Sequence, residues 1–504
     1  MDLEYKLRKE DFVANLSGGS ISEITCVTLV APAAVLLWSA LQSRRNFFAP
    51  YGPAAFFTDF LLNVGAILFA TTAYSSAPAL LNLLLILPAA LISSFSKPLA
   101  ATRKSSVSST KANGSVSNPS LVASSALPVQ GFLTTYRGAM MVATCIAILA
   151  VDFRVFPRRF AKVENWGTSL MDLGVGSFVF SAGVVSARSI LKSRLDATKR
   201  PTSSFLSRFM SSVRHSIPLL VLGLIRLYTV KELDYAEHVT EYGVHWNFFF
   251  TLAFLPPFVE LADVLTAYAV PSYEVLSVLF VLVYEIVLSN TTLKQYILVS
   301  PRGPDLLSKN REGVFSFIGY LSIFLAGRGT GMMVIPGIRA QQSKGTKPVT
   351  AKELAWKARK SLIQKLVIQS TCWSLLFAFS TAYFGLGLRV SRRLANLPYV
   401  LWINAFNNAQ LLLFCLIETV YFPEAYRTLP SAVTTRSASV IMQAFNKNGL
   451  AVFLVANLMT GLVNLSLNTL DMTSLGAMAV LVGYSACVTG VALLLDRMGI
   501  KIKV

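Results

Sequence analysis

The feature that most constrains this chain of 504 residues is a series of long apolar segments spread over its whole length. A helix needs about 20 predominantly apolar residues to cross the roughly 30 Å hydrocarbon core of a bilayer, and about thirteen segments meet that length. They centre near residues 21–41, 56–74, 77–95, 135–153, 169–190, 215–230, 244–265, 274–290, 313–330, 362–387, 398–420, 449–468 and 473–496. We therefore expect an all-α polytopic membrane protein that forms a single integral-membrane domain over residues 1–504.

Charged residues are scarce over the chain as a whole. They make up 14% of the sequence and apolar residues 54%, whereas soluble globular proteins carry about 25% charged residues. The longest polar segments cover only residues 96–130, 191–214, 331–361 and 421–448, so we expect no soluble catalytic domain. The Ser-rich stretch 101–125 has almost no bulky apolar side chains and is expected to be a disordered cytosolic loop.

The distribution of Lys and Arg predicts the orientation in the membrane. An odd number of spans places the termini on opposite sides, and cytoplasmic loops carry the excess of basic residues. Here the excess lies mainly in 191–215 and 328–361, which predicts a lumenal N-terminus and a cytosolic C-terminus. The net charge of +20 therefore reflects topology, and we expect no nucleic-acid partner. Two glycosylation sequons, at Asn15 and Asn290, fall on the predicted lumenal side.

Ionisable residues at the end of the fourth apolar segment are candidates for function, because charges inside a membrane are costly. Asp152 ends that segment, and Lys162 follows on the same predicted side. Pro157 lies between them and disfavours a continuous helix, so a bend could return Lys162 toward Asp152. The alternative is a carboxylate that caps the helix, followed by basic residues, Arg158 and Arg159, that meet lipid headgroups.

A second polar cluster precedes the seventh apolar segment on the same predicted side. His238, Glu241 and His245 are spaced so that all three share one helical face, unless Gly243 ends the helix. The pattern matches no zinc signature, and we expect no metal or cofactor. Because imidazole titrates near neutral pH, a site for proton transfer or hydroxyl binding is favoured. The cluster continues with Trp246 and Asn247.

Basic residues in two further loops could hold the phosphate of an anionic headgroup. Arg311 is expected to pair with Glu312 at the membrane interface, and Arg392 and Arg393 precede the eleventh segment. Snorkelling of ordinary interfacial arginines is equally compatible with these positions. Asp172, inside the fifth segment, is a further costly charge.

Motifs exclude some kinds of membrane enzyme. The sequence contains no Walker A, Rossmann or GxSxG motif, which disfavours ATP-driven pumping and serine hydrolysis. A non-enzymatic scaffold has no need of intramembrane acids and bases. Composition and motifs thus leave two alternatives, a lipid-modifying enzyme and a lipid flippase or transporter.

Segments from one end of the chain to the other resemble a single family. They are RKEDFVANLSGGSISEI (8–24), the block 150–186 that begins AVDFRVFPRRFAKVENWGTSL, EHVTEYGVHWNFF (237–249), NREGVFSF (310–317), VSRRLANLPYVLW (390–402) and NGLAVFLVANLMTGLVN (448–464). In them the sequence resembles the fungal GPI-anchor inositol acyltransferases, multi-spanning enzymes of the endoplasmic reticulum. The resemblance implies transfer of a fatty acyl chain, typically from palmitoyl-CoA, to the inositol ring of glucosaminyl-phosphatidylinositol at a lumenal active site.

The resemblance also implies an Asp–Lys pair as the catalytic centre, which falls on Asp152 and Lys162. Asp152 would be the general base for an inositol hydroxyl, and Lys162 would stabilise the thioester oxyanion or orient the carboxylate. His245 or His238 would assist with the proton, arginines would receive the substrate phosphate, and tryptophans would line the acyl chains. The expected substrate-binding residues are Arg158, Arg159, Trp166, Asp172, His238, Glu241, Trp246, Asn247, Arg311, Arg392 and Arg393. Acyl-CoA would be the co-substrate, with no separate cofactor.

Overall fold

Helices form all the regular elements of the described part of the chain, apart from an isolated bridge between Gly19 and Thr168. The computed structural model describes residues 3–96, 127, 129–196, 204–232, 239–335, 351–426 and 437–500. Within these ranges 13 helical segments are long and apolar enough to cross a membrane. The prediction of an all-α polytopic membrane protein is therefore confirmed, while the loop 101–125 lies outside the described residues.

The spans follow the apolar segments of the sequence closely. In the N-terminal half the helices are α1 (Leu3–Val13), α2 (Ile21–Thr28), α3 (Val30–Arg45), α4 (Pro53–Phe60), α5 (Ala66–Thr71), α6 (Pro78–Phe95), α7 (Gly131–Ala150), α8 (Leu170–Asp196), α9 (Phe205–Glu232) and α10 (Val239–Tyr242). The C-terminal half contains α11 (Phe248–Tyr268), α12 (Tyr273–Asn290), α13 (Leu293–Leu298), α14 (Leu306–Lys309), α15 (Arg311–Val334), α16 (Ala351–Thr381), α17 (Leu397–Tyr421), α18 (Val440–Lys447), α19 (Gly449–Ser466) and α20 (Ser474–Arg497). The first span joins α2 to α3, and the second joins α4 to α5 through the π-helical segment Leu61–Gly65.

Some helix ends differ from the sequence expectation because charged residues extend a helix beyond its apolar part. α9 begins at Phe205 rather than near residue 215. α16 begins at Ala351, inside the expected polar loop 331–361. Long basic side chains at such ends keep their charges in water while their stems cover apolar surface. α16 also ends at Thr381 rather than at 387, and Gly387 in the following turn has a left-handed backbone conformation with φ +59°.

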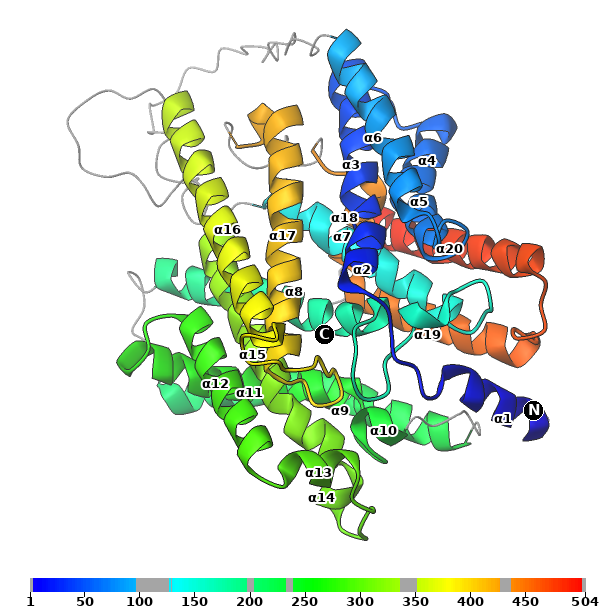
Figure 1. Cartoon of the computed structure of the whole chain (residues 1–504). Coiled ribbons are helices and arrows are strands. Elements are labelled where there is room, and N and C mark those ends of the chain that lie inside the picture. The colour runs from blue at the N-terminus through cyan, green and yellow to red at the C-terminus, as the bar shows by residue number, and fades with distance from the viewer. Residues whose placement is uncertain are drawn as a thin grey trace.

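Close packing at the centre of the molecule depends on glycine. α8 packs along α15, and a Cβ atom added to Gly183 of α8 would lie 2.1 Å from the carbonyl oxygen of Phe324. A Cβ atom added to Gly327 of α15 would lie 2.2 Å from the carbonyl oxygen of Phe180. Small residues allow membrane helices to approach this closely. Other neighbouring helices also pack in pairs, α12 on α15, α16 on α17, α11 on α9 and α3 on α6 (Figure 1).

Segments far apart in the sequence meet beside the N-terminal helix. Arg8 of α1 forms an ion pair with Asp471, 2.6 Å between Nη2 and Oδ1, in the connection between α19 and α20. Figure 1 shows α1 next to the end of α19. The bridge between Gly19 and Thr168 ties the segment before α2 to the loop that follows α7. These segments all belong to the predicted lumenal side, so the fold gathers the loops that carry the candidate residues.

Candidate active site

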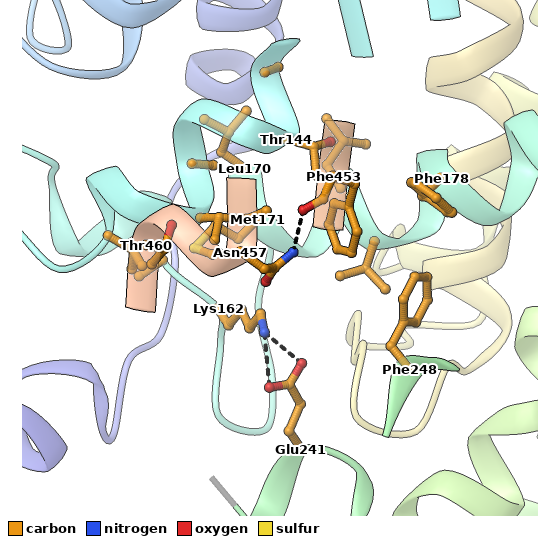
Figure 2. A pocket seen from close by; sticks show the side chains of 18 of the residues that line it. Thr144, Lys162, Leu170, Met171, Phe178, Glu241, Phe248, Phe453, Asn457 and Thr460 are labelled. Atoms are coloured by element: carbon orange, nitrogen blue, oxygen red, sulfur yellow. Dashed lines mark hydrogen bonds and ion pairs between the residues drawn. The ribbon is translucent and has the colours of Figure 1, made fainter. Parts of the chain in front are cut away.

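A large cavity lies along α7. Its volume is about 1110 Å³. One face of α7 lines it from Tyr136 through Ala143 to Val151, a length of about 22 Å for an α-helix. Helices α8, α11 and α19 add apolar wall, including Leu170, Met171, Phe178, Phe248 and Phe453 (Figure 2). Residues of α1, α2, α3, α5, α9 and α17 complete it. A concave, mostly apolar space with a few polar groups is typical of a small-molecule site.

Asp152 lines this cavity directly beyond the last turn of α7. Asn464 of α19 donates from Nδ2 to Oδ2 of Asp152 at 2.7 Å. Lys9 of α1 in turn donates from Nζ to Oδ1 of Asn464 at 2.7 Å. Burial raises the pKa of Asp152, and the hydrogen bond from Asn464 and the charges of Lys9 and Arg158 oppose that rise only in part. The carboxylate is therefore more basic than an exposed aspartate.

Lys162 lines the same cavity but takes a different carboxylate as its partner. As expected from Pro157, α7 ends before this proline, and the loop beyond it contains one 3₁₀ turn, Arg158–Phe160. The loop turns Lys162 toward Glu241, with Nζ 2.7 Å from Oε1 and 2.9 Å from Oε2 (Figure 2). Asp152 and Lys162 thus line one cavity, but the ammonium group of Lys162 pairs with Glu241 and not with Asp152.

Glu241 is held as an anion by two cations. Burial alone would raise its pKa, but Lys162 and Arg392 outweigh burial and lower the pKa of Glu241 to about 2. Nη1 of Arg392 lies 3.4 Å from Oε1 of Glu241. α10 carries Glu241 and ends at Tyr242, because Gly243 has φ +122°. Of the two alternatives left open by the sequence, the structure has the helix end before Gly243, so Glu241 and His245 do not share one helix.

Asp172 connects the Lys162 loop to Arg392. Its Oδ1 lies 2.6 Å from Nε of Arg392, and its Oδ2 accepts from the backbone N–H of Val163 at 3.1 Å and from Ser169 at 2.8 Å. Asp172 is 1% exposed and does not line the cavity. It holds the residue next to Lys162 by its backbone, which makes it a positioning residue.

The histidine cluster lies only in part within the described residues. His245, Trp246 and Asn247 line the cavity, while His238 falls outside the described part of the chain. The backbone N–H groups of His245 and Trp246 both donate to Oδ1 of Asn310, at 2.8 and 2.9 Å. Nδ1 of His245 is buried with no hydrogen-bond partner among the described atoms. Asn247 caps α11 by accepting from the N–H groups of its first turn.

Two predicted arginines lie outside the cavity and stabilise the loop instead. Arg158 donates to three backbone carbonyl oxygens, those of Val151, Phe153 and Phe156, at 2.8 to 3.1 Å. Its guanidinium lies 3.8 Å above the ring of Phe12, and burial lowers the pKa of Arg158 to about 10. Arg159 forms an ion pair with Glu23 at 2.6 Å. Neither side chain lines the cavity.

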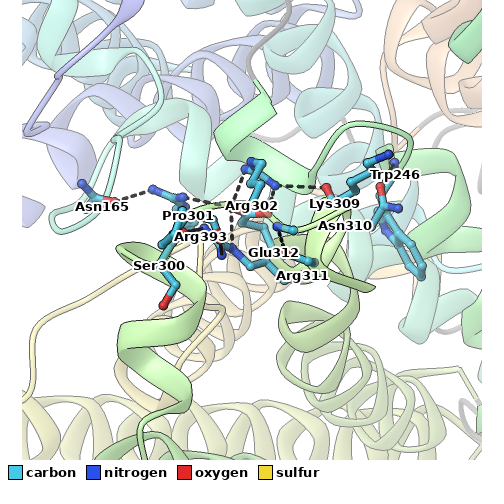
Figure 3. A network of polar contacts seen from close by, with 12 residues as sticks. Asn165, Trp246, Ser300, Pro301, Arg302, Lys309, Asn310, Arg311, Glu312 and Arg393 are labelled. Atoms are coloured by element: carbon cyan, nitrogen blue, oxygen red, sulfur yellow. Dashed lines mark hydrogen bonds and ion pairs between the residues drawn. The ribbon is translucent and has the colours of Figure 1, made fainter. Parts of the chain in front are cut away.

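Arg311 and Arg393 belong to a separate network centred on Glu312 (Figure 3). Glu312 is fully buried and lies 2.7 Å from Arg302, 2.9 Å from Arg393 and 3.8 Å from Arg311. The expected pair of Arg311 and Glu312 is present, but it is buried rather than exposed at an interface. Trp166 is likewise outside the large cavity and lines a smaller one. Of the arginines proposed from sequence, only Arg392 lines the large cavity.

Sequence reasoning missed the connection of two polar residues to Asp152. Lys9 lines the cavity, and Asn464 lies behind its wall and bonds to Asp152. Lys9 lies in a polar N-terminal segment whose place beside α19 could not be inferred from local pattern. Asn464 carried a signal, because an amide inside an apolar span usually finds a partner, but the partner could not be deduced. No group of three His, Cys, Asp or Glu residues within the described ranges could hold a metal ion.

Comparison with known proteins gives full-length similarity. The GWT1 family model matches residues 5–495. A protein of Aspergillus oryzae named "GPI-anchored wall transfer protein 1" is 60% identical over 511 residues, and the match covers 100% of both chains. Proteins with the same name from Emericella nidulans and Candida albicans are 61% identical over 510 residues and 38% identical over 515 residues, again with 100% of both chains covered.

Proposed function

Because this chain belongs to the GWT1 family, we propose that it is an O-acyltransferase of GPI-anchor biosynthesis in the endoplasmic reticulum membrane. It moves a palmitoyl chain from palmitoyl-CoA to the inositol ring of glucosaminyl-phosphatidylinositol. The name of its relatives supports the GPI-anchor assignment, and the segments quoted from the sequence support the acyl transfer. We further propose that the N-terminus is lumenal and the C-terminus cytosolic, following the distribution of basic residues.

The main support for the proposal is a single cavity that has a long apolar wall and charged side chains at one end. The face of α7 offers an extended apolar wall for an acyl chain. The cavity volume of about 1110 Å³ is slightly above the usual range of roughly 300–1,000 Å³ for ligand pockets. Asp152, Lys162 and His245 lie beyond the last turn of α7 or on the loops beside it. A chain bound along α7 would therefore present its thioester to these side chains.

Asp152 acts as the general base in the proposed reaction. It removes the proton from an inositol hydroxyl while the oxygen attacks the thioester carbonyl carbon, and its raised pKa makes Asp152 a stronger base than an exposed aspartate. The carbon–sulfur bond then breaks, and the proton on Asp152 passes to the departing CoA thiolate. His245, with a free Nδ1 in the same cavity, is the second group that can carry the proton.

Lys162 stabilises the negative charge that develops on the thioester oxygen. Its ammonium group is held in place by Glu241, and preorganised charge of this kind accounts for much of the rate enhancement in acyl transfer. Arg392 fixes Glu241 and is the proposed contact for the substrate phosphate, since it alone of the predicted arginines lines the cavity. Lys9 is a second cation for that phosphate.

The proposal is tested by incubating purified protein with glucosaminyl-phosphatidylinositol and labelled palmitoyl-CoA. Label is expected in an inositol-acylated lipid, and Asp152→Asn is expected to reduce its formation by about 10²–10⁴-fold. Arg154→Gln is the matched control, because Arg154 is an exposed residue of the same loop and does not line the cavity. A wild-type protein that forms no acylated lipid would overturn the proposal in favour of a flippase or transporter.

A further inference from the structure

A second, smaller cavity lies where two membrane spans end. Its volume is about 320 Å³. α12 ends at Asn290 and α17 begins at Leu397, and the cavity lies between the segments that adjoin these ends. It is therefore at the depth of lipid headgroups rather than of the hydrocarbon core. Its walls are Trp166, Glu285, Leu288, Lys294, Gly387, Leu388, Arg389, Leu394 and Asn396.

Two cations converge on one indole ring in this cavity. Nζ of Lys294 lies 5.2 Å from the ring centroid of Trp166, and the guanidinium carbon of Arg389 lies 5.7 Å from it. Two positive charges that both lie within about 6 Å of one ring centroid repel each other. The cavity wall contains one carboxylate, that of Glu285, which interacts electrostatically with Lys294 and whose Oε2 accepts from the backbone N–H of Leu397 at 2.9 Å. Two cations therefore face one carboxylate. The wall thus has a net positive charge that an anion would neutralise.

The remaining wall residues suit a ligand that is only partly polar. Leu288, Leu388 and Leu394 supply apolar surface. Basic pockets between membrane helices on the cytoplasmic or matrix side bind phosphorylated lipid headgroups. Arg and Lys bind phosphate through the same charge-assisted hydrogen bonds on either side of a membrane. We propose that this cavity binds the headgroup of an anionic phospholipid, with the phosphodiester between Lys294 and Arg389 and the glycerol backbone against Trp166.

The same two segments form walls of both cavities. Lys162 faces the large cavity and Trp166 the small one, four residues further along the same loop. On the segment before α17, Arg392 lines the large cavity and Arg389 the small one. The N–H of Gly167 donates to the carbonyl oxygen of Val390 at 2.9 Å and joins the two segments. A bound phospholipid therefore holds together the two segments that position Lys162 and Arg392.

Lipid retention in nanodiscs tests the binding site without any activity measurement. The full-length protein is reconstituted in phosphatidylcholine alone or in a roughly 4:1 mixture with phosphatidylglycerol, and retained lipids are counted by native mass spectrometry. Lys294→Gln/Arg389→Gln is expected to weaken phosphatidylglycerol retention by about tenfold, as for the loss of charge-assisted hydrogen bonds. Arg154→Gln/Lys309→Gln removes two charges from the same predicted side outside the cavity and should retain as much as wild type. Equal retention by both double variants would overturn the proposal.

Hydrogen exchange at Gly167 tests the link between the two segments and identifies the ligand. Phosphatidylglycerol is expected to slow exchange of this N–H in wild type but not in Lys294→Gln/Arg389→Gln. Inorganic phosphate added to discs of phosphatidylcholine alone should have no effect. Slowing by inorganic phosphate but not by phosphatidylglycerol would identify a site for a free anion and would contradict the lipid assignment. Because neither experiment measures acyl transfer, failure of the proposed function would leave this result interpretable.

Discussion

At the scale of single residues, the separate partners of Asp152 and Lys162 explain how both can contribute to one reaction. A carboxylate paired directly with an ammonium group loses basicity, because the positive charge lowers its pKa. Here Lys162 is paired with Glu241, and Asp152 accepts from the neutral amide of Asn464. Asp152 keeps a raised pKa while a positive charge remains available in the same cavity.

Removing the amide partner should change the pH profile of the proposed reaction. Asn464→Ala deletes a hydrogen bond that lowers the pKa of Asp152, so this pKa should rise further. Because the general base must be deprotonated, the acid limb of kcat/KM is expected to move to higher pH. Asn457→Ala is the control, since Asn457 bonds to Phe453 of its own helix and should leave the limb in place. An unmoved limb in Asn464→Ala would contradict the assignment of Asp152 as base.

Glu241→Gln should impair the reaction through Lys162. Without its carboxylate partner the ammonium group is no longer held, and misplacement of a catalytic group by about 1 Å can cost roughly 10²-fold in rate. We expect kcat to fall by about that factor, with little change in KM for acyl-CoA. The double variant Glu241→Gln/Lys162→Ala should be no slower than Lys162→Ala, because groups that act as a unit are not additive. Additive losses would show that Glu241 acts independently of Lys162.

At the scale of helices, the contact between α8 and α15 depends on the absence of side chains. Gly183→Ala would place a Cβ atom 2.1 Å from a carbonyl oxygen of α15, and overpacking of this kind costs about 1–3 kcal/mol. Gly490→Ala is the matched control, because a Cβ atom there meets nothing within 4 Å. Thermal unfolding in detergent should show a lower Tm for the first variant and an unchanged or higher Tm for the second. A Tm for Gly183→Ala equal to that of wild type would show that the two helices can separate without cost.

The spans could be predicted from sequence because apolar length is a local property. The start of α16 could not, since its first turns carry Lys and Arg and acquire their structure from the helix that follows. The candidate site likewise has a part that sequence predicts and a part that it does not. The sequence identified Asp152 and Lys162 as functional candidates, but the pairing of Lys162 with Glu241 joins residues on two separate loops. Such partners are determined by tertiary packing, which no local pattern records.

The arginines also show what sequence cannot predict, because residues that suggest a ligand site can instead form ion pairs within the protein. Arg311 and Arg393 are basic residues of the kind that bind phosphate, yet in the fold both form ion pairs with the buried carboxylate of Glu312. A basic residue near a membrane interface can serve a ligand, a lipid or its own protein equally well by sequence. The position of Arg392 on the cavity wall is the reason for proposing it as the substrate contact.

At the scale of the whole molecule, the proposed orientation can be tested by chemical labelling. Arg154 and Lys192 are both exposed and lie at opposite ends of spans. In sealed microsomes, a membrane-impermeant maleimide is expected to label Lys192→Cys and to reach Arg154→Cys only after the membrane is permeabilised. The unsubstituted protein corrects for labelling of the native cysteines. The reverse pattern would invert the topology and place the large cavity's charged end on the cytosolic side.

In the proposed enzyme, the length of the large cavity along α7 would limit the length of the acyl chain that can bind. The cavity wall runs about 22 Å from Val151 to Tyr136, and the hydroxyl of Tyr136 donates to Oδ1 of Asn407 at 2.7 Å. A large side chain placed on this wall would shorten the space along α7. Ala143→Trp should therefore shift the preference toward shorter acyl-CoA donors in a chain-length series, and an unchanged preference would place the acyl chain elsewhere. Donor selection would then be set by the geometry of one helix and not by recognition of any particular chemical group.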